Sequence, residues 1–231
     1  ARKCLASACP DTCWRLARGN FKDLELIAKD NGFEKVDGVL FDLGVSSHQL
    51  ETARRGFSFN LEGPLDMRMD PTLAVTAADL VNGLTKNELE ELFKKFSDEP
   101  RAATIAEAIV RARRVEPIKT CGQLVNIVGA GRGRLHPATR VFQTLRMAVN
   151  DELNNLSQAL PQAVGLLKPG GRLVVISFHS GEDRIVKNFL KEQKIKGNLI
   201  MISKKPFMAT AAEMAANPKS RSAKLRVGEK L

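Results

Sequence analysis

The sequence predicts an α/β fold that a helical segment interrupts. Two apolar runs of strand length, Val36 to Phe41 and Arg172 to Phe178, are typical of strands covered on both faces, as in a parallel sheet. Apolar residues with helical spacing precede the first run and follow the second. Between about Val45 and Pro137, strand-like runs disappear and helical periodicity takes over. We therefore expect an α/β domain with an inserted helical domain.

The chain opens with alternating predicted elements. Residues 1–9 are typical of the end of a helix, and Cys13 to Ala17 predict a short strand. Phe21 to Ala28 follow helical spacing, and Asn31-Gly32 supplies a stop signal before the first long strand.

Helices are expected throughout the insert and just after it. A capping box at Thr85 to Glu88 introduces one helix, and a second runs through Ile105 to Ala112. A long helix is predicted from Thr139 to about Ala163, with an apolar stripe for the core and a polar stripe that includes Asn150.

The α/β pattern returns after a turn at 167–171. Ser180 to Asp183 are expected to cap the helix that follows the strand ending at Phe178. Asn198 to Ser203 predict a last strand. We interpret the remainder as a basic tail.

The charge balance favours a partner made of phosphates. The chain has 231 residues, and 36 Lys and Arg against 26 Asp and Glu give a formal charge of +10. The cations cluster around 111–114, 132–140 and 219–230, although solubility alone is the alternative explanation.

No segment predicts secretion, a membrane span or a metal site. The sequence has no run of about 18 apolar residues and no secretion signal at its start, so we expect an intracellular protein, in a bacterial cytoplasm or an organelle, without a membrane partner. The four cysteines and three histidines lack the spacing of metal ligands, and we expect no metal.

Two strand ends are candidate ligand sites, because ligands bind beyond the carboxyl ends of strands in open sheets. Asp42 ends the first long strand before Gly44 and a group of hydroxyls, although it could instead cap the following helix. His179 follows the second strand, where a structural histidine is the commoner case. The glycine-rich stretch Val128 to Gly133 could be a nucleotide loop of an oxidoreductase. A basic loop near RNA is the favoured interpretation, because no strand leads directly into a helix there.

The sequence resembles the 16S rRNA cytosine-N4 methyltransferase family, the MraW or RsmH type, in blocks that cover nearly everything from Asn20 to Lys230. The blocks that carry the resemblance are Leu43-Gly44-Val45-Ser46-Ser47, Arg55-Gly56-Phe57-Ser58-Phe59, Gly63 to Asp70, His136 to Arg140, Val149 to Leu153, Ser177 to Ser180, Glu182 to Lys187 and Arg221 to Arg226.

The resemblance implies a Rossmann-like class I methyltransferase sheet, S-adenosylmethionine as the cofactor, and a cytosine of small-subunit rRNA, free or in a ribosomal subunit, as the substrate. It places the methyltransferase domain at 1–50 and 138–231 and a substrate-recognition domain at 51–137. Phe21, Asp42 and Gln49 are the expected cofactor contacts. The family's N-terminal glycine-rich cofactor motif does not occur in the sequence, which leaves open whether the protein itself lacks it.

We expect Asp42, Ser46 and Asn150 on the catalytic side of the pocket, where a carboxylate would accept the N–H of the cytosine amine. The expected phosphate contacts are Arg140, Arg146, Arg184, Arg221, Lys224 and Arg226. The alternative function is a non-catalytic RNA-binding or ribosome-assembly factor that kept the fold. A homodimer is compatible with the sequence.

Overall fold

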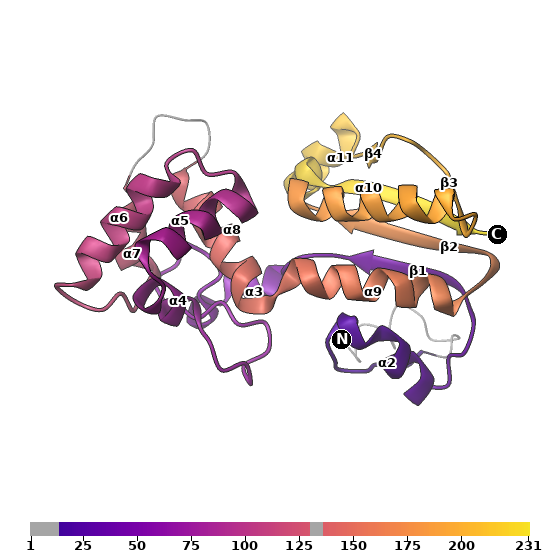
Figure 1. The fold of residues 1–231 in the computed structure, drawn as a ribbon, viewed down its shortest axis with the longest axis horizontal. Helices are drawn as coiled ribbons and strands as arrows, with labels where there is room; N and C mark the ends of the chain where they lie inside the picture. Colours follow the sequence, from indigo (N-terminus) through magenta and orange to yellow (C-terminus); the bar gives the residue numbers. More distant parts are fainter. Residues whose placement is uncertain (1–13, 130–135) are drawn as a thin grey trace. The chain divides into compact units, whose positions relative to one another are not determined.

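A computed structural model describes residues 14–129 and 136–231 of the chain. They divide into two compact units (Figure 1), which we call the sheet unit (14–43 and 153–231) and the helical unit (44–152). The helical domain expected over 51–137 lies within the helical unit, which also takes in 44–50 and 138–152. No helix in the described ranges has the length and apolarity needed to span a membrane.

The sheet unit contains a five-stranded mixed sheet, and the predicted α/β class is confirmed. The strands are β1 (Val36–Asp42), β2 (Leu167–Ser177), β3 (Leu199–Met201), β4 (Phe207–Met208) and β5 (Lys224–Lys230). Their order is β1-β2-β5-β3, and β4 also pairs with β5. β1 and β2 run parallel, whereas β5 is antiparallel to each of its neighbours.

One face of the sheet carries the core of this unit. The helices and 3-10 helices of the sheet unit are η1 (Phe21–Asp23), α2 (Leu24–Asp30), α9 (Glu152–Leu166), α10 (Ser180–Ile195), α11 (Ala211–Ala216) and η3 (Pro218–Ser222). Phe41 of β1 and Val175 of β2 are paired, lie on the same face, and share one buried cluster with Leu160 of α9 and Leu190 of α10. Both long helices therefore cover the same face.

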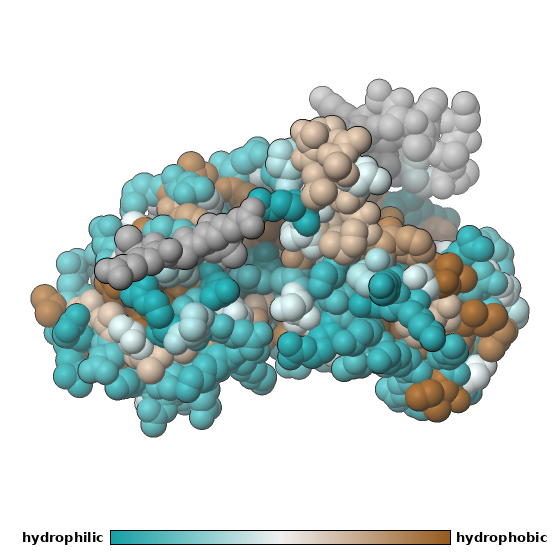
Figure 2. Space-filling view, turned by 90° about the horizontal axis from the view of Figure 1, so that it is seen from above, coloured by the Kyte–Doolittle hydropathy of each residue, from teal (hydrophilic) through white to brown (hydrophobic). Residues whose placement is uncertain are grey.

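The expectation that β1 is covered on both faces is wrong for the described residues. Leu40 alternates with the buried Phe41 and is 63% exposed, because α9 and α10 both pack on the other face. Elsewhere, in the view of Figure 2, the surface is mainly hydrophilic, and hydrophobic residues interrupt it singly or in small groups.

The expected basic tail is instead a strand inside the sheet. β5 lies between β2 and β3, and its charged residues have partners in the fold: Arg226 pairs with Asp183, and Lys230 donates to the carbonyls of Val164 and Leu167. The basic composition of this segment gave no sign of a strand, although its backbone pairs with β2 on one side and β3 on the other.

The helical unit has its own apolar core. Its elements are α3 (Ser47–Glu51), η2 (Ala53–Arg55), α4 (Ala77–Gly83), α5 (Lys86–Ser97), α6 (Ala102–Arg113), α7 (Cys121–Val128) and α8 (Pro137–Asn150). Leu89, Phe93, Ile105 and Leu145 are fully or almost fully buried together. The predicted helices at Thr85 and Ile105 are confirmed, and Thr85 forms the expected capping box with Glu88.

The single long helix predicted from Thr139 to Ala163 is wrong, because the chain forms two helices there. Asp151 takes a left-handed conformation with φ of 50° between α8 and α9, which Asp tolerates better than most residues. The apolar stripe also serves two cores: Leu145 belongs to the core of the helical unit, and Leu156 to that of the sheet unit.

The start of the chain departs from the prediction in one place. Residues 14–17 form no strand, and Leu16 is 42% exposed, so the predicted strand at Cys13 to Ala17 is wrong over its described part. The helix end expected at residues 1–9 lies outside the described residues, as does most of the glycine-rich stretch, whose residues 130–133 are not described. The apolar residues before that stretch belong to helix α7.

Gly56 should be essential for packing in the helical unit. Its φ is +69°, and an added Cβ would lie 2.2 Å from the Pro64 carbonyl oxygen. We expect Gly56→Ala to lower the free energy of unfolding by at least about 2 kcal/mol, through backbone strain and overpacking. The measurement is urea unfolding followed by circular dichroism.

Gly83→Ala is the matched control, because Gly83 lies in α4 with no heavy atom within 4 Å of an added Cβ. It should be neutral or stabilising by up to about 1 kcal/mol. Equal unfolding midpoints for the two variants would contradict the strain assigned to Gly56.

Candidate functional site

The carboxyl ends of β1 and β2 form the candidate site in the sheet unit. Asp42 ends β1 opposite Ile176, and the ladder continues with a 3.1 Å hydrogen bond from the Leu43 N–H to the Ile176 carbonyl. Gly44 then turns the chain with φ of 95°. The Asp42 side chain is exposed, and its carboxylate has no hydrogen-bonding or ionic partner within the described part of the chain. It is thus available to a ligand.

Phe21 lies beside this strand end. Asn20 caps η1 by accepting a 3.0 Å hydrogen bond from the Lys22 N–H, which places Phe21 at the start of the helical segment. The Phe21 ring contacts Phe41 edge to face, with centroids 5.9 Å apart. The structure therefore places Phe21 against Phe41, the residue that precedes Asp42 in β1 and projects from the other face of the strand.

Ser46 and Gln49 lie in the helical unit and bind each other. Ser46 is the N-cap of α3, and its hydroxyl accepts from the Gln49 N–H while the Gln49 side-chain oxygen accepts from the Ser46 N–H at 2.9 Å. This capping box also settles the alternative for Asp42, because Ser46 caps α3 and Asp42 does not.

His179 has a structural role at the end of β2. Its Nδ1 accepts from the N–H groups of Gly181 and Glu182 at 3.2 and 3.3 Å, which makes it the N-cap of α10. Glu182 completes the capping box by accepting from the N–H groups of Phe178 and His179. The geometry supports the structural interpretation of this histidine.

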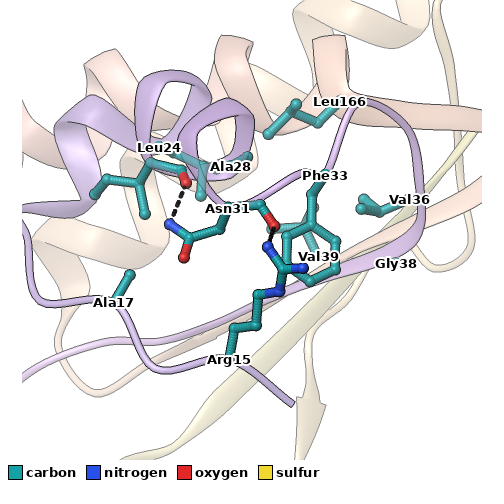
Figure 3. A pocket seen from close by; sticks show the side chains of 11 residues that line it. Arg15, Ala17, Leu24, Ala28, Asn31, Phe33, Val36, Gly38, Val39 and Leu166 are labelled. Carbon is teal, nitrogen blue, oxygen red and sulfur yellow. Dashed lines mark hydrogen bonds between the residues drawn. The ribbon is translucent and has the colours of Figure 1, made fainter. Parts of the chain in front are cut away.

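A separate pocket of about 270 Å³ lies at the opposite end of β1. Its walls come from α2, from the start of β1 around Val36, and from the segment at Arg15 (Figure 3), and they are mostly apolar. The Arg15 guanidinium donates to the Asn31 carbonyl at its rim. Neither Phe21 nor Asp42 lines this pocket, so it is distinct from the candidate site.

Asn150 holds a loop of the helical unit together. Its side-chain oxygen accepts from the Met69 N–H at 2.6 Å, and its amide donates to the carbonyls of Met67 and Arg146 at 2.8 Å. The residue is buried, and Met67 is held with a φ of 62°. These bonds occupy the amide that sequence reasoning assigned to orienting the base, and we assign Asn150 a structural role instead.

Two of the six expected phosphate contacts form ion pairs inside the fold instead. Arg146 makes a two-pronged pair with Glu152 at 2.8 and 2.9 Å, and Arg226 is 6% exposed and bound to Asp183. Their guanidinium groups are occupied by carboxylates, which corrects their assignment as phosphate contacts. Arg184 and Arg221 are exposed, and Arg140 is partly exposed beside the buried Glu99.

Asp183 is the residue that sequence reasoning missed. Its carboxylate binds Arg226 at 2.7 Å and Lys224 at 3.3 Å, and so ties the first turn of α10 to β5. Burial opposes ionisation of Asp183, but Arg226 and Lys224 outweigh it and hold the pKa of the carboxyl below its usual value. The partners lie 43 and 41 residues away, so local patterns carried no signal for this contact.

Comparison with known proteins gives a consistent result. The family model described as the MraW methylase family matches residues 1–231. Proteins named ribosomal RNA small subunit methyltransferase H are similar to the chain in several bacteria. That of Thermomicrobium roseum is 49% identical, over 92% of the chain and 71% of the relative. Those of a Methylobacterium species and Coprothermobacter proteolyticus are each 48% identical, over 94% of the chain and 70% and 73% of the relatives.

Removing the Asn150 amide should destabilise the helical unit. Asn150→Ala leaves the Met67 carbonyl and the Met69 N–H without their partner, and we expect a loss of about 2–4 kcal/mol in the free energy of unfolding. Asn87→Ala is the control, because Asn87 is exposed in α5, and it should change stability by less than about 0.5 kcal/mol. The measurement is urea unfolding of both variants. Equal free energies of unfolding would contradict the structural role assigned to Asn150.

Asp183→Asn should destabilise the sheet unit in a pH-dependent way. Near pH 7 it leaves Arg226 buried without a carboxylate, at a cost of about 3 kcal/mol. The folded pKa of Asp183 is depressed, so its contribution is complete above the unfolded value of about 3.9 and disappears as pH falls through the folded pKa.

The measurement is the urea midpoint of both proteins from pH 7 to pH 3. The gap between them should be widest at neutral pH and narrow in acid. A gap that stays constant over the whole range would show that the charge of Asp183 contributes nothing.

Proposed function

Because the chain belongs to the MraW methylase family, we propose that it is an S-adenosylmethionine-dependent methyltransferase that modifies the exocyclic N4 of a cytosine in small-subunit rRNA. The observation that carries the proposal is the match of this family over 1–231, together with an exposed carboxylate at the carboxyl edge of the sheet. That edge is where open α/β sheets bind their ligands.

The residues at this edge fit the proposed cofactor. S-adenosylmethionine carries positive charge on its sulfonium and amino groups, and the unpartnered Asp42 carboxylate complements such charge. Phe21, which contacts the residue before Asp42, offers an aromatic ring against which an adenine can pack. Both residues belong to the sheet unit, so their proximity is a property of that unit alone.

Asp42 is also the proposed catalytic group. The bound cofactor supplies an electrophilic methyl group. The cytosine amine is a weak nucleophile, because its lone pair is delocalised into the ring. A carboxylate that accepts its N–H favours the developing positive charge on nitrogen, and Asp42 has a free carboxylate for this. The same oxygen can take the proton that the amine loses once the new N–C bond has formed.

The remaining candidates have more limited roles. Ser46 and Gln49 form the capping box of α3, and Ser46 stays a proposed residue of the catalytic side and Gln49 a proposed cofactor contact. Arg140, Arg184, Arg221 and Lys224 remain proposed phosphate contacts, since each keeps some exposed surface. Unstacking the target base costs least in single-stranded or looped RNA, which favours such a region as the substrate.

Asp42→Asn is the direct test of the proposed site. It should lower methyl incorporation into small-subunit rRNA by about 100-fold or more, because the amide cannot accept a proton and carries no charge. Since Asp42 is exposed, the unfolding midpoint should not change.

Asp37→Asn is the matched control, because Asp37 is an exposed carboxylate at the other end of β1, paired with Lys168. It should leave methylation within about twofold. Titration calorimetry with S-adenosylmethionine adds an independent readout. An unchanged rate in the Asp42 variant would sink its catalytic role, and a parent protein that binds no cofactor would favour a non-catalytic RNA-binding or ribosome-assembly factor.

A further inference from the structure

Asp42 lies at one end of a row of residues that crosses the sheet. Asp42 pairs with Ile176, Ile176 pairs with Leu225, and Leu225 pairs with Phe207. Directly paired residues project from the same face, and neighbouring strands lie about 5 Å apart. Phe207 is therefore about 15 Å from Asp42, on the same face and at the same end of the sheet.

Phe207 is an exposed aromatic residue among cations. Its exposed fraction is 51%, whereas most large apolar side chains of this unit are covered. Exposed cations lie on the segments around it. We call this set the cationic rim, and it consists of Arg184, Lys204, Lys205, Lys219 and Arg221.

The buried ion pair between Asp183 and Arg226 connects the segments that carry the cationic rim. Arg226 binds Asp183, which directly precedes Arg184 in α10, and also donates to the Lys204 carbonyl at 3.4 Å. η3, which carries Lys219 and Arg221, leads directly into the strand of Arg226. In Figure 1, α11 and the start of α10 lie at the end toward which the arrows of β1 and β2 point.

Negative charge is nearly absent from the exposed part of these segments. Among the residues of 180–184, 203–207 and 210–224, the acids are Glu182, Asp183 and Glu213. Glu182 is 3% exposed and caps α10, and Asp183 is paired with Arg226 and Lys224. Only Glu213 of α11 faces solvent beside the five cations of the rim. The surface thus keeps a net positive charge.

We propose that the cationic rim and Phe207 bind the single-stranded RNA next to the target cytosine, with the phosphates on the rim and one base stacked on Phe207. The proposal rests on the proposed function, which puts the reacting base at Asp42. Cations that follow a backbone, together with an exposed aromatic ring for stacking, are the combination that single-stranded nucleic acid requires. A few nucleotides span the distance from Asp42 to Phe207.

The charge of the rim is tested with a triple variant, Lys204→Gln, Lys205→Gln and Arg221→Gln. The control removes the same number of charges from the far end of α10, with Lys191→Gln, Lys194→Gln and Lys196→Gln. Binding of a labelled single-stranded fragment of small-subunit rRNA is followed by fluorescence anisotropy between 50 and 200 mM KCl. We expect the rim variant to bind about tenfold more weakly and its salt slope to fall by about 2, and the control to keep most of both.

Stacking is tested separately with Phe207→Ala, and Ile195→Ala serves as the control because Ile195 is also exposed, at the end of α10. Loss of stacking should weaken RNA binding about fivefold or more at every salt concentration, without a change in the salt slope. The Ile195 control should bind as the parent does. Circular dichroism midpoints confirm that the exposed substitutions leave the fold intact.

Rim and control variants with equal affinities and equal salt slopes would overturn the proposal, as would Phe207→Ala with parental affinity. So would loss of binding to anionic phospholipid vesicles without loss of RNA binding, which would assign the surface to a membrane. RNA binding that depends on the rim in a protein that transfers no methyl group would support the rim and contradict the proposed activity.

Discussion

The pairing register of three strands determines which side chains lie together at the edge of the sheet that carries the candidate site. Because β1 is parallel to β2, the ends at Asp42 and Ser177 lie at one edge. Because β5 is antiparallel to β2, it begins at that same edge, with Lys224 opposite Ser177. A two-residue shift of β5 would move its basic start by about 7 Å along the strands. The distance between the exposed carboxylate and the exposed cations therefore depends on this register.

The Asp183–Arg226 pair stabilises that register from the side of the helices. A buried ion pair gains little over apolar packing, since both charges lose their hydration, but removal of one partner leaves a charge stranded in the core. For β5, such a pair disfavours registers that bury Arg226 away from Asp183. The neighbouring Gly228 acts in the same direction, because an added Cβ would lie 2.8 Å from Leu190 Cδ2. The strand fits α10 closely at one position along its length.

Local patterns predicted helices α2, α5, α6 and α10 and both parallel strands, because caps and periodicity act within a few residues. They carried no signal for β5, because its charged residues are paired with Asp183, with Arg172 and with the carbonyls of Val164 and Leu167, which no local window contains. The break between α8 and α9 at Asp151 was not predicted for a similar reason. The apolar spacing continues through Asp151, but the apolar side chains before and after it belong to two different cores.

The residues of the candidate site also differ in whether their partners lie near or far in the sequence. Phe21 and Asp42 stay predicted cofactor contacts, and the structure places the Phe21 ring against Phe41, the residue before Asp42 in β1. Asn150 and Arg226 were assigned to ligands, yet their partners at Met67 and Asp183 are 83 and 43 residues away. A polar residue on a helix stripe, or a cation in a basic segment, looks the same in sequence whether it faces a substrate or closes a loop.

Because Asp42 is exposed, the substrate itself would have to exclude water from the proposed site. A carboxylate in water interacts weakly with a developing charge, and the same carboxylate acts strongly only where water is excluded. Phe21 and Phe41 cover one side of the strand end, but the carboxylate itself remains in solvent. At the proposed site, the bound cofactor and the target base would have to displace that water themselves. An RNA strand held on both sides of the reacting base does this better than a free nucleoside, because contacts made at a distance contribute the energy needed to strip water from the reacting groups.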